Sequence, residues 1–182
     1  MKTRIVQIVF IVVCVVLAAA LQDMLPTFGG TKPPILMSLV LAWAFLEREP
    51  RDPAKTKRPF YAASWIPVAV LAGAFEDALS GFPTGCASGF LVLAGGSARL
   101  LRPLTHGLEP VALGVVTAMV AAPFHELWLC MWDVVGDDPS GLVRFFAGAL
   151  PAAPTGAVLF ALLPRLLTVS GFEGADQDRR WA

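Results

Sequence analysis

The sequence predicts an all-α integral membrane protein with six transmembrane helices. Of its 182 residues, 56% are apolar and only 15% are charged, whereas about a quarter of the residues in soluble domains are charged. Mean hydropathy is +0.67. The apolar residues form continuous runs without a period of two, which favours helices over the strands of a membrane barrel. Fourteen Lys and Arg balance fourteen Asp and Glu, so net charge predicts no nucleic-acid partner.

The first apolar run, Ile5–Leu21, follows Lys2 and Arg4. At about 1.5 Å per residue it is long enough to cross a hydrocarbon core of roughly 30 Å. Small residues near its end, Ala18 to Ala20, resemble a signal-peptide cleavage site. The run is longer than the apolar core of about 7 to 15 residues found in signal peptides, so we expect a retained helix.

The second run, Ile35–Leu46, is short for a membrane span. Its 12 residues reach only about 18 Å. The loop that follows is strongly basic, and short basic loops stay in the cytoplasm. Since the basic amino end is also expected there, two crossings must lie between them, so the short run is predicted to span the membrane. The basic residues of this loop are Arg48, Arg51, Lys55, Lys57 and Arg58.

Four further spans complete the predicted bundle. With both termini in the cytoplasm, twelve of the fourteen Lys and Arg fall on the cytoplasmic side, and only Lys32 and Arg144 fall outside. This partition predicts a multi-pass membrane protein. One domain would cover residues 1–170, and residues 171–182 would form a short cytoplasmic tail. The four spans are predicted at Phe60–Leu79, Gly85–Leu101, Leu108–Trp132 and Leu142–Leu163.

Ionisable residues near the outer ends of three predicted spans form the main candidate site. Counted along the helices, these residues lie at similar heights. They are either interfacial charges that face water or a cluster in which Asp77, with Glu76 or Glu126, neutralises Arg144. A cluster of this kind would have an architectural or partner-binding role. The set is Glu76, Asp77, His125, Glu126 and Arg144.

Motifs for catalysis or metal binding are incomplete. His125-Glu126 begins like a zinc protease helix, but position 129 is Leu and the only other histidine is His106. We expect the serine hydroxyls of Ser80, Ser88 and Ser97 to bond backbone or a neighbouring helix. The sequence therefore predicts no enzyme, no cofactor and no metal. Small residues between 85 and 98 indicate either close packing within the bundle or a face for another membrane protein.

Two stretches resemble MreD, the rod shape-determining membrane protein family of bacteria. One is the first helix running into Gln22-Asp23-Met24-Leu25-Pro26, followed by Pro33-Pro34 and the second run. The other is residues 73–85, which resemble the family's Gly-x-x-x-Asp-x-x-Ser-Gly-x-x-x-Gly segment through Gly73, Asp77, Ser80, Gly81 and Gly85. The resemblance covers about residues 5–102. It implies a non-enzymatic scaffold of cell-wall elongation in the bacterial inner membrane. The scaffold would act with MreC, with MreB and with the RodA-type peptidoglycan synthase and its penicillin-binding protein.

The resemblance also supplies a second hypothesis. Similar proteins share a six-helix plan with the substrate-binding subunits of energy-coupling factor vitamin transporters. A subunit of that kind would bind a small molecule near His125 and Glu126. The basic loop likewise has two interpretations: a solvated loop that only fixes topology, or a surface that contacts anionic headgroups or the filament.

Overall fold

The structure, a computed structural model, describes residues 2–27, 32–46, 64–81, 83–105, 107–132 and 149–169. These residues are helical apart from short connections, and the described part contains no strand. The all-α class is thereby confirmed. The helices are α1 (Lys2–Met24), α2 (Ile35–Leu46), α3 (Trp65–Ser80), α4 (Cys86–Leu101), the 3-10 helix η2 (Arg102–Thr105), α5 (Pro110–Trp132) and α7 (Ala149–Val169).

Helix bounds agree with the predicted runs to different degrees. α2 has the predicted bounds, and α4 begins one residue after the predicted Gly85 because that glycine caps the helix. α1 extends beyond the predicted run at both ends, since polar residues continue the helix where no proline stops it. α7 continues to Val169, past the predicted end at Leu163, because Pro164 lies within the helix rather than ending it. Residues 60–63 and 142–148 of the predicted spans lie outside the described residues.

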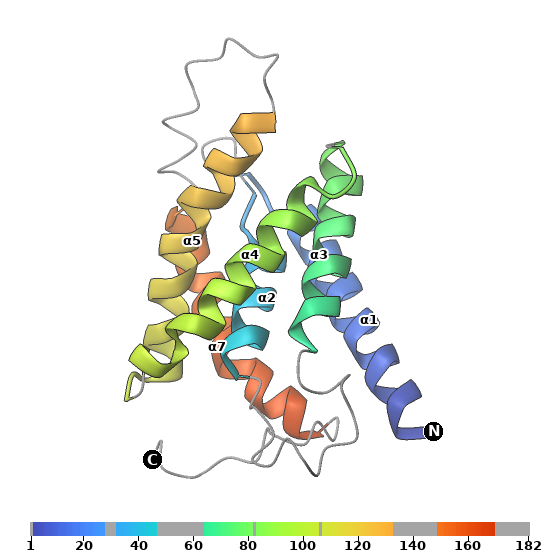
Figure 1. The fold of residues 1–182 in the computed structure, drawn as a ribbon, viewed down its shortest axis with the longest axis vertical. Coiled ribbons are helices and arrows are strands. Elements are labelled where there is room, and N and C mark those ends of the chain that lie inside the picture. Colours follow the sequence, from blue (N-terminus) through green and yellow to red (C-terminus); the bar gives the residue numbers. More distant parts are fainter. Residues whose placement is uncertain are drawn as a thin grey trace.

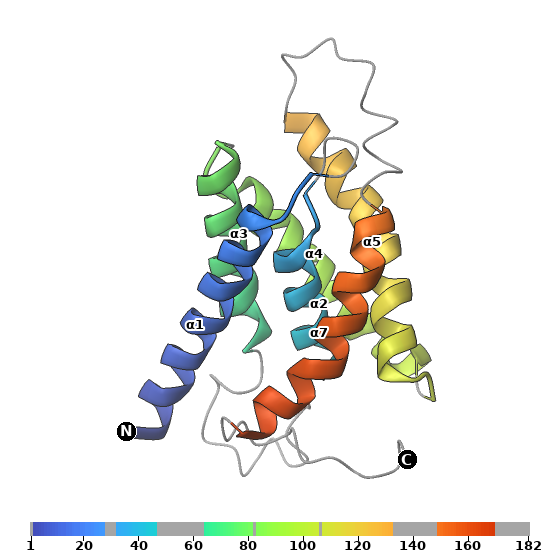
Figure 2. The same ribbon diagram turned by 180° about the vertical axis from the view of Figure 1, so that it is seen from behind.

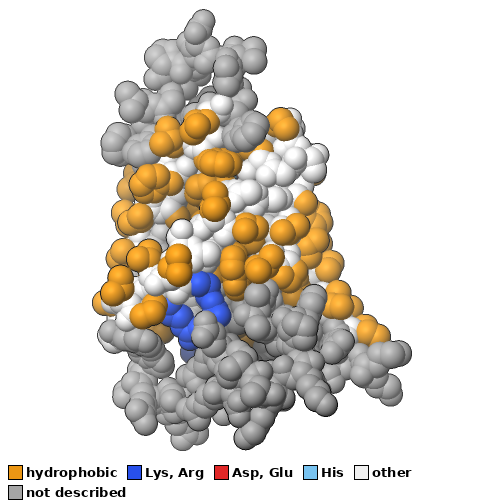
Figure 3. Space-filling model, viewed as in Figure 1, with side chains coloured by type: hydrophobic (Ala, Val, Ile, Leu, Met, Phe, Trp, Pro, Cys, Tyr) orange, Lys and Arg blue, Asp and Glu red, His pale blue; other side chains and the backbone are white. Residues whose placement is uncertain are grey.

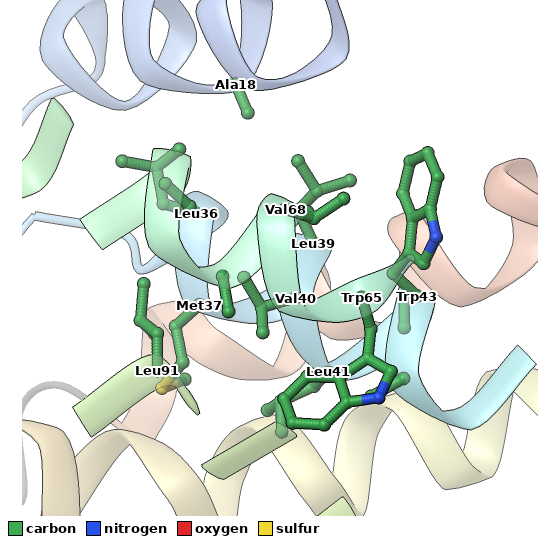
Figure 4. Close-up of a cluster of buried hydrophobic side chains, with 14 of the residues drawn as sticks. Ala18, Leu36, Met37, Leu39, Val40, Leu41, Trp43, Trp65, Val68 and Leu91 are labelled. Carbon is green, nitrogen blue, oxygen red and sulfur yellow. The ribbon is translucent and has the colours of Figure 1, made fainter. Parts of the chain in front are cut away.

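Helix α2 lies at the centre of the bundle. It packs against α1, α3, α4, α5 and α7 (Figures 1 and 2). Eleven of its twelve residues are buried, so it is apolar all round, as expected for a helix surrounded by other helices. Figure 4 shows its side chains, including Leu36 and Val40, between Ala18 of α1, Val68 of α3 and Leu91 of α4.

Three polar contacts hold α2 to its neighbours. The side-chain oxygen of Gln22 accepts a hydrogen bond from the Leu36 backbone N–H at 3.0 Å, which satisfies one of the free donors at the start of α2. The Ser38 hydroxyl lies 3.1 Å from the Thr155 hydroxyl of α7. The Trp43 indole N–H donates to the Ser64 hydroxyl at 3.0 Å, just before α3. The central helix is therefore fixed in register as well as buried.

The other helices form two pairs around α2. α3 and α4 are joined by a tight turn and pack along their length (Figure 1). α5 and α7 pack against each other although residues 133–148 separate them in the chain. Figure 2 shows these two pairs on opposite sides of α2, with α1 beside α3.

Three described helices are long and apolar enough to cross a membrane, judged by length and composition. They are α1, α5 and α7, and α2 is a shorter apolar helix. Large apolar side chains such as Val9, Leu17 and Leu162 are exposed on the outside of the bundle. Figure 3 shows hydrophobic side chains over the middle of one face and Lys or Arg side chains at its lower end. This surface is compatible with a membrane protein, since monomeric soluble proteins rarely expose large apolar patches.

Candidate functional site

The turn between α3 and α4 depends on two glycines in the left-handed conformation. Gly81 ends α3 with φ 74°, and its N–H donates to the Asp77 carbonyl at 3.0 Å. Gly85 precedes α4 with φ 101°. Only glycine adopts this conformation without strain from a Cβ atom, and a left-handed glycine is a common way to end a helix. The two glycines reverse the chain and place the start of α4 beside the end of α3.

Asp77 binds the first turn of α4. Its Oδ2 accepts a hydrogen bond from the Gly85 N–H at 2.7 Å, and its Oδ1 accepts one from the Ala87 N–H at 2.8 Å. The first N–H groups of a helix have no partner within the helix, and the positive end of the helix dipole favours a carboxylate. Asp77 is only 3% exposed. A carboxylate from α3 thus caps α4 at a buried position.

Gly73 lets α3 and α4 approach closely. A Cβ atom at this position would overlap the Ser88 backbone and lie 2.6 Å from the Ser88 hydroxyl. Ser88 donates to the Val70 carbonyl of α3 at 3.2 Å. Ser80 donates to the Glu76 carbonyl, and Ser97 donates to the Leu93 carbonyl at 2.9 Å. The expectation that these hydroxyls bond backbone is confirmed.

Small residues of α4 also pack inside the bundle. A Cβ atom on Gly95 would lie 2.6 Å from the Trp65 ring of α3, so the indole lies directly on the glycine. Gly95 and Ala98 are buried. At these positions, the interpretation of close packing within the bundle is confirmed.

Glu76 of α3 and His125 of α5 meet inside the bundle. The Glu76 Oε1 atom lies 3.4 Å from the His125 Nε2 atom, and the residues are 7% and 3% exposed. In the described part of the chain, Glu76 Oε2 and His125 Nε2 have no hydrogen-bond partner. The 3.4 Å approach is therefore an ion-pair contact without hydrogen-bond geometry.

Aromatic side chains cover this pair. The Phe90 ring of α4 has its centroid 4.9 Å from that of His125, and the Trp128 ring of α5 lies 6.1 Å from Phe90. The Trp128 indole N–H donates to the Cys86 carbonyl at 2.9 Å. The α5 helix is thus attached to the α3–α4 hairpin by the Glu76–His125 contact, two aromatic contacts and one hydrogen bond.

The structure brings together part of the predicted charge cluster. Glu76 meets His125, and Asp77 lies on the same turn of α3 but is bound to the α4 amides. Glu126 is partly exposed on α5. Arg144 lies outside the described residues, so its pairing with Asp77, Glu76 or Glu126 stays a prediction. The basic loop residues Arg48, Arg51, Lys55, Lys57 and Arg58 also lie outside the described residues.

The sequence interpretation missed a close contact between α5 and α7. Gly114 of α5 and Gly156 of α7 face each other, and a Cβ atom on Gly156 would overlap the Gly114 carbonyl and lie 2.6 Å from the Ala118 Cβ. The available signal is a four-residue spacing of small residues, Gly114, Ala118 and Ala122 on α5 with Ala152 and Gly156 on α7.

The polar groups of this site hold helices together. Within the described ranges, no three His, Cys, Asp or Glu side chains come together as metal ligands would. The site contains one capping carboxylate and one buried carboxylate–imidazole pair.

Comparison with models of known protein families, with curated proteins and with solved structures found no match.

Proposed function

We propose that this chain is a non-enzymatic membrane scaffold of the bacterial cell-wall elongation machinery and is needed for rod cell shape. One observation carries the proposal: each of the five residues that carry the family-like motif has a structural task at the α3–α4 turn. Gly73 allows close approach, Asp77 caps α4, Ser80 bonds the α3 backbone, and Gly81 and Gly85 reverse the chain. A motif used to build a rigid hairpin is what a scaffold requires, whereas an enzyme would direct its polar groups at a substrate.

The proposed topology has six membrane spans with both termini in the cytoplasm. Two features support it. The start of α1 and the end of α7 lie at one end of the bundle (Figure 1). Arg99 lies in the last turn of α4 and Arg102 directly follows the helix, at that same end, while Lys32 pairs with Asp23 at the other. A one-sided distribution of Lys and Arg is the usual signature of the cytoplasmic side.

Cysteine labelling tests this topology. In a variant without native cysteines, a single Lys55→Cys should resist a membrane-impermeant thiol reagent in intact cells, and a single Asp137→Cys should react. The opposite pattern would reject the proposed orientation. Labelling of both positions after membrane disruption shows that each cysteine is accessible.

Partners of the scaffold would be the bilayer, MreC, the MreB filament and the RodA-type synthase. Depletion in the rod-shaped source cell tests this role, and we expect rounded, wider cells with mislocalised wall synthesis. Wild type and Ser97→Ala should restore the rod shape, because the Ser97 hydroxyl bonds only its own helix in the described contacts. Asp77→Ala should fail to restore it, at equal membrane abundance. Normal cell shape after full depletion would refute the proposal.

The basic loop offers a sharper experiment on partner binding. Charge reversal of Lys55, Lys57 and Arg58 should leave insertion intact and abolish shape support if the loop docks on a partner. Loss of insertion alone would identify a purely topogenic loop. Reversal of Arg179 and Arg180 in the tail is the matched control for a change in cytoplasmic charge.

A substrate-binding subunit of a vitamin transporter is the second candidate. The observation that favours it is the buried Glu76–His125 pair, because polar groups inside a membrane bundle mark binding sites by default. After depletion, a growth requirement for one vitamin together with normal cell shape would support this candidate.

A further inference from the structure

The Glu76–His125 pair is a polar contact that a scaffold does not require. It joins α3 and α5, which are not packing neighbours over the rest of their described lengths. The two side chains reach each other past the start of α4, beneath Phe90 and Trp128. The pair therefore connects the α3–α4 hairpin to the α5–α7 pair.

Two buried atoms of the pair lack a hydrogen bond. Glu76 Oε2 and His125 Nε2 have no hydrogen-bond partner among the described residues. Burying an unpaired polar group is unfavourable, and burying an unpaired charge is far more so. An ionised Glu76 beside a neutral imidazole would leave one whole negative charge inside the bundle.

The described cations do not pair with Glu76, since Lys32, at the same end of the bundle, pairs with Asp23 instead. Around the pair, the titratable groups are Asp77 on α3, Cys86 on α4 and Glu126 on α5, and none of them supplies positive charge. α2 has no titratable residue. Arg99 lies thirteen residues after Cys86, or about 20 Å along α4, and Arg165 is in the last turns of α7.

We propose that Glu76 and His125 form a buried proton-binding site that holds one proton between the carboxyl group and the imidazole. In one arrangement the imidazolium Nε2–H donates to the carboxylate. In the other the carboxyl O–H donates to the neutral Nε2. Either way the pair is neutral in total, and the proton is taken from water and returned to water without any other bond changing.

Proton binding at this site couples pH to helix packing. With the proton present, α5 is attached to the α3–α4 hairpin by a neutral, hydrogen-bonded pair. Loss of the proton leaves a buried carboxylate, and relief of that charge requires water to enter or α3 and α5 to separate. The bundle should therefore lose stability as pH rises through the value at which the pair releases its proton.

Spectroscopy on the purified full-length protein in detergent tests the proposal. The His106→Gln background leaves His125 as the only histidine, so ¹⁵N imidazole shifts report its protonation, and infrared absorption reports a protonated carboxyl. A free imidazole is only about one-tenth protonated at pH 7.5. In the folded protein we expect the pair to hold its proton in more than half of the molecules at that pH, on either group.

Two variants and one control make the result decisive. Glu76→Gln should give a neutral His125 at pH 7.5 and no carboxyl band from this site. His125→Gln should leave Glu76 as a protonated carboxyl, which keeps the test available if Glu76→Gln does not fold. Glu109→Gln, the same change at an exposed residue beside the far end of α5, should leave the signals of the pair unchanged. An ionised Glu76 together with a neutral His125 in the folded protein at pH 7.5 would overturn the proposal.

Discussion

The α3–α4 hairpin and the α5–α7 pair show two ways of holding apolar helices together. In the hairpin, a buried carboxylate binds two backbone amides of the neighbouring helix, and two left-handed glycines form the turn. In the α5–α7 pair, Gly114 and Gly156 bring the two backbones into contact. The hydroxyls of Thr117 and Thr155 in this pair bond carbonyls of their own helices.

The two pairs should therefore fail in different ways. Directional hydrogen bonds are lost when atoms are removed, because the buried amides of α4 would then lack an acceptor. Close backbone packing is lost when atoms are added, because there is no space into which a side chain could move. Substitutions that remove or add a few atoms can separate these two mechanisms.

The largest effect is expected for Gly156→Ala. The new methyl group would overlap the Gly114 carbonyl and force α5 and α7 apart. We expect a loss of about 3 kcal/mol in the free energy of unfolding, at the upper end for overpacking. Gly96→Ala is the matched control, since its Cβ would lie 3.7 Å from the Trp65 ring, an ordinary contact. Thermal unfolding in detergent measures both, and equal melting temperatures would contradict the close packing of α5 and α7.

Asp77→Ala is expected to rank next. It leaves the Gly85 and Ala87 amides without their acceptor, at a cost of about 2 kcal/mol. Asp77→Asn keeps one acceptor oxygen and should lose less. Denaturant titration of the two variants gives the order, and an Asp77→Asn as unstable as Asp77→Ala would show that charge, not hydrogen bonding, stabilises the cap.

A smaller effect is expected for Gly81→Ala. No atom lies within 4 Å of the added Cβ, so the cost arises from the left-handed backbone alone. This conformation costs about 1–2 kcal/mol for a residue with a Cβ atom. Gly81→Asn should recover part of the loss, because Asn tolerates this conformation better than Ala does. The measurement is again the melting temperature, and identical values for Ala and Asn would contradict a conformational cause.

The smallest effect is expected for Ser38→Ala. This change removes the hydrogen bond between the Ser38 hydroxyl of α2 and the Thr155 hydroxyl of α7. Hydrogen bonds between membrane helices contribute about 0.6 kcal/mol on average. A double-mutant cycle with Thr155→Val should give a coupling energy of that size. A coupling energy of zero would show that this hydrogen bond does not help to hold α2 against α7.

Sequence alone could predict the helices because apolar runs and their limits are local properties. α2 has its predicted bounds, and α4 differs by one residue. Glu76 and His125 lie at similar heights along two predicted helices, but the sequence analysis did not predict their contact. The expectation that several ionisable groups would meet in one layer is consistent with that contact, while the part played by Arg144 stays a prediction.

The remaining contacts depend on which helices are neighbours. Asp77 binds amides at positions 85 and 87 because Gly81 and Gly85 adopt positive φ values, and charge positions alone do not reveal this. The Gly114–Gly156 contact requires α5 and α7 to pack face to face. Small residues at a four-residue spacing also occur on helices that do not pair in this way, so their partner cannot be identified from one sequence.

The burial of α2 also has a consequence for the order in which the protein is made. A chain is synthesised from its N-terminus, so α2 leaves the ribosome long before α7, which supplies the Thr155 contact 117 residues later. Until then, the face of α2 that carries Ser38 has no helix to cover it. That face must be shielded by other means while the chain is incomplete, and α2 reaches its final surroundings only after α7 has been made.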